Sequence, residues 1–399
     1  MTIPEEENSS LRPAQGKAGA TTGTHVQSLD GVRAFAIIAV LLTHAGMPGF
    51  EAGWIGVDLF FALSGFLITT LLLQEQERMG SISYKDFLVR RALRLMPAYL
   101  VYVAAMTYGI WGWSGSVRSD HGGWSPEGFT LALWTYAVNF APAGGIWNGQ
   151  DITLHLWSLA VEQQYYLIWP LVVIALVPFP RRLLAVGCVL TGVALLAFVL
   201  WGDDGLYKTS MLFTRGFTLA MASTCAVAAY QQRHRIGKWP WRWFGIPGVA
   251  VVALAFVLSA LHLWPHEKVL SNLLPFMSVA FVLWVTGLWY RPLSPRLAPI
   301  MLNSTIQYIG KVSYGIYLYH ELVRVIVWFV AKPLMSAWPA SLGYGVRLLL
   351  YIALSVALAA LSYELMEKKF LKLRKAFRPT AAATTFPVSA AAPQARTRP

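Results

Sequence analysis

The sequence has few charged residues for a chain of 399. Charged side chains make up 13% of it and hydrophobic residues 56%, with a mean hydropathy of +0.51. A soluble domain carries about 25% charge, so this low content excludes an ordinary soluble enzyme and a disordered protein. Apolar runs of about 20 residues recur, without the alternation over about 10 residues that is typical of an outer-membrane barrel. The sequence predicts an all-α, polytopic integral membrane protein.

Cysteine and the common metal-binding spacings are scarce as well. The chain has two cysteines, Cys188 and Cys225, and both fall inside apolar runs, which excludes a disulfide framework or a cysteine-rich metal site. The HExxH spacing of zinc proteases is absent, as is the GxSxG elbow of serine hydrolases. The sequence therefore predicts neither a metal site nor a serine hydrolase.

Ten apolar segments are predicted to cross the bilayer as helices, within a membrane domain of residues 29–370. They lie at 31–48, 54–74, 97–113, 157–177, 183–201, 211–230, 244–262, 270–290, 312–331 and 344–364. The shorter stretch 125–140 is expected to lie at the interface or to re-enter the membrane, because a crossing there would invert every later loop. The flanks 1–28 and 371–399 are expected to be a disordered tail and a basic, then low-complexity, tail.

The distribution of positive charge predicts the orientation of these segments. The formal net charge is +13, and with a cytosolic N-terminus 24 of the 32 Lys and Arg residues fall in cytosolic segments and 4 in outer segments. This asymmetry follows the positive-inside rule and predicts a multi-pass cell-membrane protein with both termini cytosolic. The bilayer therefore explains the basic charge, and no nucleic-acid-binding motif is found, so no nucleic-acid partner is expected.

Ionisable groups inside apolar segments are costly and usually functional. Arg33 and His44 are eleven residues apart, which places them on one face of a helix about 16 Å apart along its axis. Asp58 and Glu162 lie at a depth similar to that of His44, so the three side chains are predicted to converge on one polar pocket. An imidazole with a carboxylate partner is the usual general base. A buried structural network and, for Arg33, an interfacial anchor are the alternatives.

A short basic helix that ends at Pro97 is predicted on the cytosolic side. Its Arg90, Arg91 and Arg94 could anchor the chain to anionic lipid. They could also bind a phosphorylated ligand, because arginine pairs with phosphate oxygens in a bidentate manner. A further set of ionisable residues within the apolar segments is expected to form structural ion pairs: Arg215, His320, Glu321, Arg324 and Arg347.

Five motifs in order resemble those of the membrane acyltransferase-3 family, which O-acylates sugars and related hydroxyl compounds. They are LDGVRAFAIIAVLLTH (29–44), GWIGVDLFFALSGFLI (53–68), FLVRRALRLMPAY (87–99), LWSLAVEQQYYLIWP (156–170) and VSYGIYLYH (312–320). The resemblance implies an acyl-CoA donor, with Arg33 and His44 as the family's Arg-x10-His pair and His44 as the base. It places Arg90, Arg91 and Arg94 near the CoA phosphates. Glu162 matches the family's Ser-Leu-x-Val-Glu segment, although Gln163 replaces the second Glu common there.

The predicted function is an integral-membrane O-acyltransferase that moves an acyl group, acetyl above all, from acyl-CoA to a hydroxyl. The acceptor would be a glycan, a glycolipid or a glycosylated natural product such as a macrolide. In this reading Asp58 or Glu162 orients His44, and the acceptor contacts are Ser158, Tyr165, His320 and Arg215.

The alternative is a transporter or exporter with a buried proton relay, which the lack of an internal repeat disfavours. The acceptor hydroxyl, the acyl length and the oligomeric state stay open.

Overall fold

The computed structural model is a bundle of α-helices. It describes residues 26–112, 126–140, 153, 155–201, 211–236, 238–239, 250, 252–254, 256–261, 266–291, 293–335 and 338–377, and the regular structure within these residues is helical throughout. The prediction of an all-α fold is thus confirmed. Five helical stretches of this described part are long and apolar enough to cross a membrane: Glu51–Met79, Leu156–Leu176, Pro180–Leu200, Leu273–Tyr290 and Ala340–Leu373. Several spans are supported, whereas the count of ten stays a prediction.

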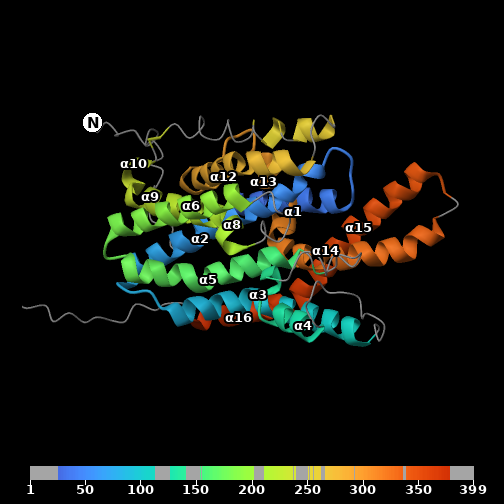
Figure 1. Ribbon diagram of the computed structural model, residues 1–399, viewed down its shortest axis with the longest axis horizontal. Helices are drawn as coiled ribbons and strands as arrows, with labels where there is room; N and C mark the ends of the chain where they lie inside the picture. The colour runs from blue at the N-terminus through green and yellow to red at the C-terminus, as the bar shows by residue number, and fades with distance from the viewer. Residues whose placement is uncertain are drawn as a thin grey trace, which may run out of the picture.

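The chain forms an N-terminal and a C-terminal group of helices, which intermix in one bundle (Figure 1). The first group contains α1 (Gln27–His44), η1 (Glu51–Ile55), α2 (Gly56–Met79), α3 (Tyr84–Gly112), α4 (Pro126–Trp134), η2 (Val138–Phe140), α5 (Leu156–Leu176) and α6 (Pro180–Trp201). The second contains α8 (Leu212–Arg215), α9 (Phe217–Gln231), α10 (Arg233–Ile236), α12 (His266–Tyr290), α13 (Ala298–Met301), α14 (Ser304–Leu334), α15 (Ala340–Ser362), the π-helical turn η4 (Tyr363–Glu367), α16 (Lys368–Leu373) and η5 (Arg374–Phe377).

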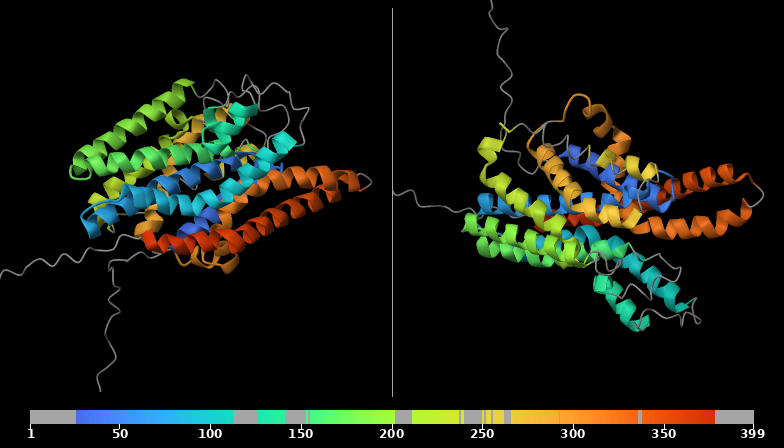
Figure 2. Two further views of the ribbon diagram at one scale, coloured as in Figure 1. Left: turned by 90° about the horizontal axis from the view of Figure 1, so that it is seen from below. Right: turned by 45° about the horizontal axis from the view of Figure 1, so that its top comes forward.

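Close helix contacts bring distant parts of the chain together. The most extensive contacts join α2 to α9, α1 to α14, and α14 to α15, and the last two helices project from the bundle as a pair (Figure 2). Glycine permits two of these approaches. A Cβ at Gly65 would overlap the carbonyl oxygen of Leu219, and a Cβ at Gly310 would overlap that of Asp30. The α1–α14 contact brings His44 of α1 next to His320 of α14.

The structure corrects one predicted boundary, since α3 continues through Pro97 instead of ending there. A proline removes one helical hydrogen bond, but apolar helices tolerate it where neighbouring helices support the backbone. Beside Pro97, Tyr314 donates a hydrogen bond to the carbonyl oxygen of Leu95. The basic helix and the predicted segment 97–113 are therefore one continuous element.

The predicted interfacial stretch 125–140 contains the nine-residue helix α4. At 1.5 Å per residue this helix is about 14 Å long, less than half of the roughly 30 Å hydrocarbon core, so it is too short to cross the membrane by itself. It packs against α3, where Tyr99 donates to the carbonyl oxygen of Leu133 at 2.7 Å. The predicted segment 244–262 is described only in part, at residues 250, 252–254 and 256–261, and the predicted tails lie outside the described residues apart from 26–28 and 371–377.

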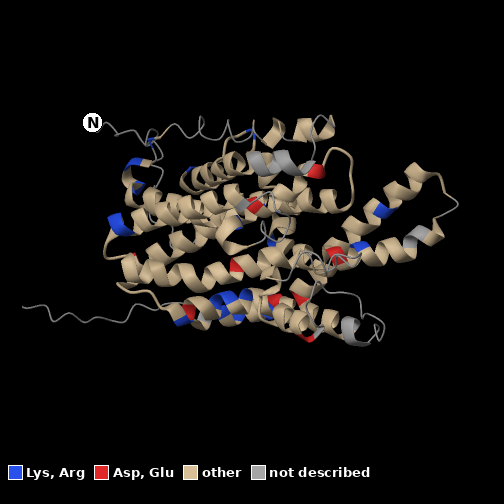
Figure 3. Cartoon of the chain, viewed as in Figure 1, with Lys and Arg blue, Asp and Glu red and all other residues tan. Residues whose placement is uncertain are grey.

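Basic side chains gather at one end of the bundle (Figure 3). Arg181 and Arg182 begin α6, Arg233 and Arg235 lie in α10, and Lys85 lies at the start of α3. The central parts of the long helices carry few charges, and these few form the site described next.

Candidate active site

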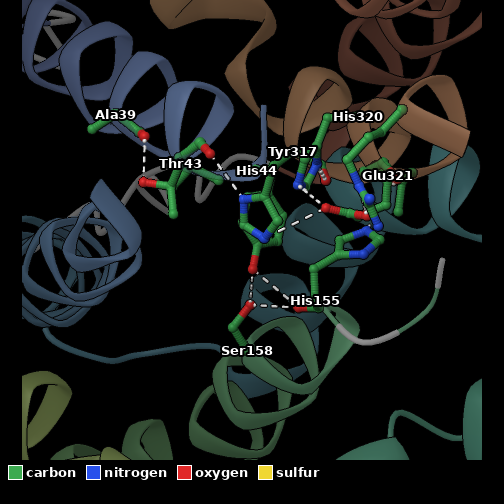
Figure 4. Close-up of polar contacts among 11 residues, drawn as sticks. Ala39, Thr43, His44, His155, Ser158, Tyr317, His320 and Glu321 are labelled. Atoms are coloured by element: carbon green, nitrogen blue, oxygen red, sulfur yellow. Dashed lines mark hydrogen bonds and ion pairs between the residues drawn. The ribbon is translucent and has the colours of Figure 1, made fainter. Parts of the chain in front are cut away.

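His44 is the last residue of α1 and faces the middle of α14 (Figure 4). Its Nδ1 lies 2.8 Å from the carbonyl oxygen of Val40 one turn earlier. Because a carbonyl oxygen can only accept, this contact assigns a proton to Nδ1, and in the neutral ring the lone pair is then on Nε2. Nε2 lies 3.4 Å from Oε1 of Glu321. The histidine thus presents its basic nitrogen next to a carboxylate.

Glu321 is held in place by its own helix. Its Oε2 accepts a hydrogen bond from Nε of Arg324 at 2.7 Å, and its Oε1 lies 3.5 Å from Nε2 of His320. The Glu321 side chain is 2% exposed, whereas that of His44 is 32% exposed. The carboxylate is therefore shielded, while the imidazole beside it stays accessible to an incoming molecule.

His155, just before α5, completes this group, which we call the histidine cluster: His44, His155, His320, Glu321 and Arg324. The ring of His320 lies 4.9 Å from the rings of both His44 and His155. His155 Nε2 lies 3.1 Å from the carbonyl oxygen of Leu318. Three helices therefore meet at this point of the bundle.

Ser158 supports the same junction between α5 and α14. Its hydroxyl donates to the carbonyl oxygen of His155 at 3.0 Å and lies 2.5 Å from the hydroxyl of Tyr317 (Figure 4). Tyr317 also donates to the His155 carbonyl oxygen, at 3.0 Å. Ser158 thus lies beside the histidine cluster.

A second polar group, the arginine cluster, is formed by Arg33, Arg91, Arg94, Glu162 and Tyr166. Arg33, near the start of α1, pairs with Asp30. Glu162 of α5 accepts hydrogen bonds from Ser64 and Tyr166. The Arg91 guanidinium lies 5.3 Å from the centre of the Tyr166 ring.

Two guanidinium groups of the arginine cluster, those of Arg91 and Arg94, have no close ion-pair partner in the part of the chain that the structure describes. Within the described residues neither Arg91 nor Arg94 forms an ion pair or a hydrogen bond to another side chain. Burial, with a smaller contribution from the positive charge of Arg94, lowers the pKa of Arg91 to about 10. Arg91 still carries its charge at neutral pH. An anionic ligand would relieve this unfavourable burial of like charges.

Arg90 lies on the same helix but has a different environment. Its guanidinium donates to Glu75 at 2.6 Å and to the carbonyl oxygen of Phe377 at 2.7 Å. It therefore ties α2 and the C-terminal segment to α3, and both of these contacts would compete with a phosphate.

The sequence predicted that Asp58 and Glu162 would share a polar pocket with His44. In the structure neither carboxylate contacts His44. Asp58 is fully buried and accepts a hydrogen bond from Arg215 at 2.8 Å. The guanidinium of Arg215 lies between Trp54 and Trp157, 5.3 and 5.4 Å from the centres of their rings. Arg215 thus forms an ion pair with Asp58.

Tyr165 also lies away from the histidine cluster. Its hydroxyl donates to that of Ser223 in α9, at 2.6 Å. The carboxylate beside His44 is that of Glu321, which sequence reasoning had assigned only to a structural ion pair. The signal that could have found it is its place next to His320 in an apolar segment, since a charge there is costly.

Comparison with known proteins places the chain in a family. The model of a family described as an acyltransferase domain matches residues 26–364. The chain belongs to this acyltransferase family. It is 30% identical over 366 residues to the peptidoglycan O-acetyltransferase OatA of Listeria monocytogenes, which covers 87% of this chain and 56% of that protein. It is 27% identical over 361 residues to the putative peptidoglycan O-acetyltransferase YrhL of Bacillus subtilis, which covers 86% of this chain and 54% of that protein.

The chain thus spans little more than half the length of these curated relatives. No solved structure matches it. The match from residue 26 to residue 364 includes both polar clusters, so the family assignment and the geometry concern the same part of the molecule.

Proposed function

We propose that the chain is an integral-membrane O-acyltransferase that moves an acetyl group from acetyl-CoA to a hydroxyl of a glycan. The observation that carries the proposal is the pairing of His44 Nε2 with the buried carboxylate of Glu321, at the end of a helix whose start lies in the arginine cluster. The two relatives named for peptidoglycan O-acetylation favour a cell-wall glycan as the acceptor.

The reaction needs a base, because an alcohol attacks a thioester slowly while it keeps its proton. In the proposed step Nε2 of His44 takes the hydroxyl proton as the acceptor oxygen bonds to the thioester carbonyl carbon. The carbon–sulfur bond then breaks, and the proton passes from His44 to the departing CoA thiolate. Glu321, rather than Asp58 or Glu162, stabilises the imidazolium, because it is the carboxylate that lies next to Nε2.

The donor is proposed to bind through its phosphates at the arginine cluster, with Arg91 and Arg94 as the principal contacts and Arg33 deeper in the bundle. Arginine suits this task because its planar guanidinium binds phosphate oxygens in pairs. Arg33 and His44 are about 16 Å apart along α1, a length that an extended pantetheine arm could bridge. Glu162 then acts at the donor end, where it lies close to Arg91.

The acceptor is proposed to approach His44 from its exposed side, near Ser158, His320 and Arg324. With the predicted orientation, the donor would enter from the cytosol and the glycan from outside. Asp58, Arg215 and Tyr165 would then support the helices around the pocket, since their partners lie within the protein.

The test is acetyl transfer by the full chain reconstituted in lipid vesicles with radiolabelled acetyl-CoA and peptidoglycan fragments. Mass spectrometry of the fragments should show an added acetyl ester, formed in step with free CoA. A transporter would neither release CoA nor modify the fragments, so the absence of both products would contradict the proposal.

A further inference from the structure

Three lone-pair atoms face one another inside the histidine cluster. Nδ1 of His44 is protonated because it contacts the Val40 carbonyl oxygen at 2.8 Å. Nδ1 of His320 is protonated for the same reason, since the Tyr317 carbonyl oxygen lies 2.6 Å away. Each ring therefore turns an unprotonated Nε2 toward the same oxygen, Oε1 of Glu321, at 3.4 and 3.5 Å. With both rings neutral, three electron-rich atoms converge without a hydrogen atom between them.

These atoms are also short of partners. Nε2 of His320 and Oε1 of Glu321 are buried and form no hydrogen bond. A buried polar atom without a partner costs free energy, of order 1–3 kcal/mol. A positive charge placed between the three atoms would remove this cost.

The spacing is that of metal ligands. The three atoms lie within 4.8 Å of one another. Zinc bonds to imidazole nitrogen and carboxylate oxygen are about 2.0–2.2 Å long. Ligand atoms at the corners of a tetrahedron around such an ion lie roughly 3.3–3.5 Å apart. The distances from Oε1 of Glu321 to Nε2 of His44 and of His320, 3.4 and 3.5 Å, agree with this separation between ligand atoms.

The three proposed ligands are themselves held by hydrogen bonds, as metal ligands usually are. Each histidine donates a hydrogen bond from its Nδ1–H to a backbone carbonyl oxygen, which fixes the tautomer and the ring orientation. The second oxygen of Glu321 is held by Arg324 at 2.7 Å. His44 is partly exposed, so a fourth position on the ion would be open to water.

We propose that His44, His320 and Glu321 form a binding site for one divalent ion of the zinc type. Two imidazoles and a carboxylate suit zinc better than calcium or magnesium, which prefer oxygen ligands. The absence of an HExxH spacing in the sequence does not exclude the site, because His44 and His320 lie far apart in the sequence.

A consequence follows that rests on the proposed function. Nε2 of His44 cannot accept a proton while it binds a metal ion, so zinc and the acceptor compete for the same lone pair. Zinc is therefore an inhibitor of acetyl transfer, and a chelator restores activity.

The experiment measures zinc binding by the purified full chain, stripped with a chelator and then titrated with Zn²⁺ in competition with a chromophoric chelator. The wild-type chain should bind one ion. His44→Ala, His320→Ala and Glu321→Gln should each bind zinc at least about ten- to a hundredfold more weakly. In metal sites generally, the loss of a residue that only hydrogen-bonds to a ligand already weakens metal binding by about this factor. The X-ray absorption spectrum of wild-type protein with zinc should show two imidazole ligands and no sulfur.

The matched control is His155→Asn, which removes a buried histidine of the same cluster that does not share the spacing of the three ligand atoms. It should keep zinc binding. No saturable zinc binding by the wild-type chain, or binding that survives all three ligand substitutions, would overturn the proposal. Binding that leaves transfer unchanged would remove His44 from the ligand set and overturn it as stated.

The two proposals fail in different ways. A chain that binds zinc through these residues but transfers no acetyl group retains the metal site and contradicts the proposed function. A chain that transfers acetyl groups but binds no zinc retains the function and contradicts the metal site.

Discussion

The two polar clusters of this bundle differ in how their charges are balanced. In the histidine cluster one oxygen of the single carboxylate, Glu321, pairs with Arg324, and the other faces two histidines without a hydrogen bond. In the arginine cluster Arg91 and Arg94 have no ion-pair partner among the described residues, and Glu162 accepts its hydrogen bonds from hydroxyl groups. In the proposed function, one cluster takes up and releases a proton and the other binds an anion.

This difference assigns separate tasks to the two ends of α1. Substitutions in the histidine cluster should slow the chemical step and leave donor binding intact. Substitutions in the arginine cluster should weaken donor binding and leave the chemical step largely intact.

His44→Ala should have the largest effect. A general base contributes typically 10²–10⁴-fold, so acetyl transfer should fall by at least about a hundredfold. The measurement is the rate of labelled acetyl transfer in membranes that contain equal amounts of each variant. A variant that keeps more than about a tenth of the wild-type kcat would show that His44 is not the base.

Glu321→Gln should lower kcat by about ten- to a hundredfold. An amide of the same size cannot stabilise the imidazolium, and the loss of a charged partner costs about 1.5–3 kcal/mol. KM for acetyl-CoA should stay near its wild-type value. Asp58→Asn is the matched comparison, because Asp58 is a buried carboxylate paired with Arg215 instead of His44. An equal loss of kcat in both variants at equal protein stability would contradict the role of Glu321.

Arg91→Ala or Arg94→Ala should raise KM for acetyl-CoA by roughly ten- to a hundredfold, since each loses a charge-assisted contact to phosphate. Lys85→Ala serves as the control, because it removes an exposed positive charge from the same helix. If Lys85→Ala raises KM as much as the arginine variants do, the effect comes from general attraction to the basic surface and not from a binding site.

Arg324→Gln should have the smallest effect, a loss of kcat of about tenfold or less. Arg324 holds Glu321 at 2.7 Å but is 31% exposed, and partly exposed ion pairs are weak. Combined with Glu321→Gln it should cause little further loss, because both substitutions break the same pair. Fully additive losses would show that Arg324 acts independently of Glu321.

Much of the fold was accessible from the sequence because hydropathy and helix periodicity are local signals. The helical class, the position of α1 with Arg33 and His44, and the arginines of α3 follow from short stretches of residues. The end of the basic helix at Pro97 was wrong, because the preference of proline to end a helix is also local and the tertiary support around α3 overrides it.

The partner of His44 could not be found in the same way. The sequence indicated only how deep each residue lies in its apolar segment. Asp58, Glu162 and Glu321 were all carboxylates that could have been the partner. Which one meets His44 depends on which helices are neighbours. That is decided by packing, such as the close approach of α14 to α1 at Gly310, which no single segment reveals.

The most direct test of the division between the clusters is the equilibrium binding of acetyl-CoA to His44→Ala and Arg94→Ala, measured by calorimetry on the purified chains. The account predicts that His44→Ala, although inactive, binds acetyl-CoA with wild-type affinity. Arg94→Ala should bind it at least about tenfold more weakly, the loss expected for one charge-assisted hydrogen bond. Normal binding by Arg94→Ala together with weakened binding by His44→Ala would contradict the account.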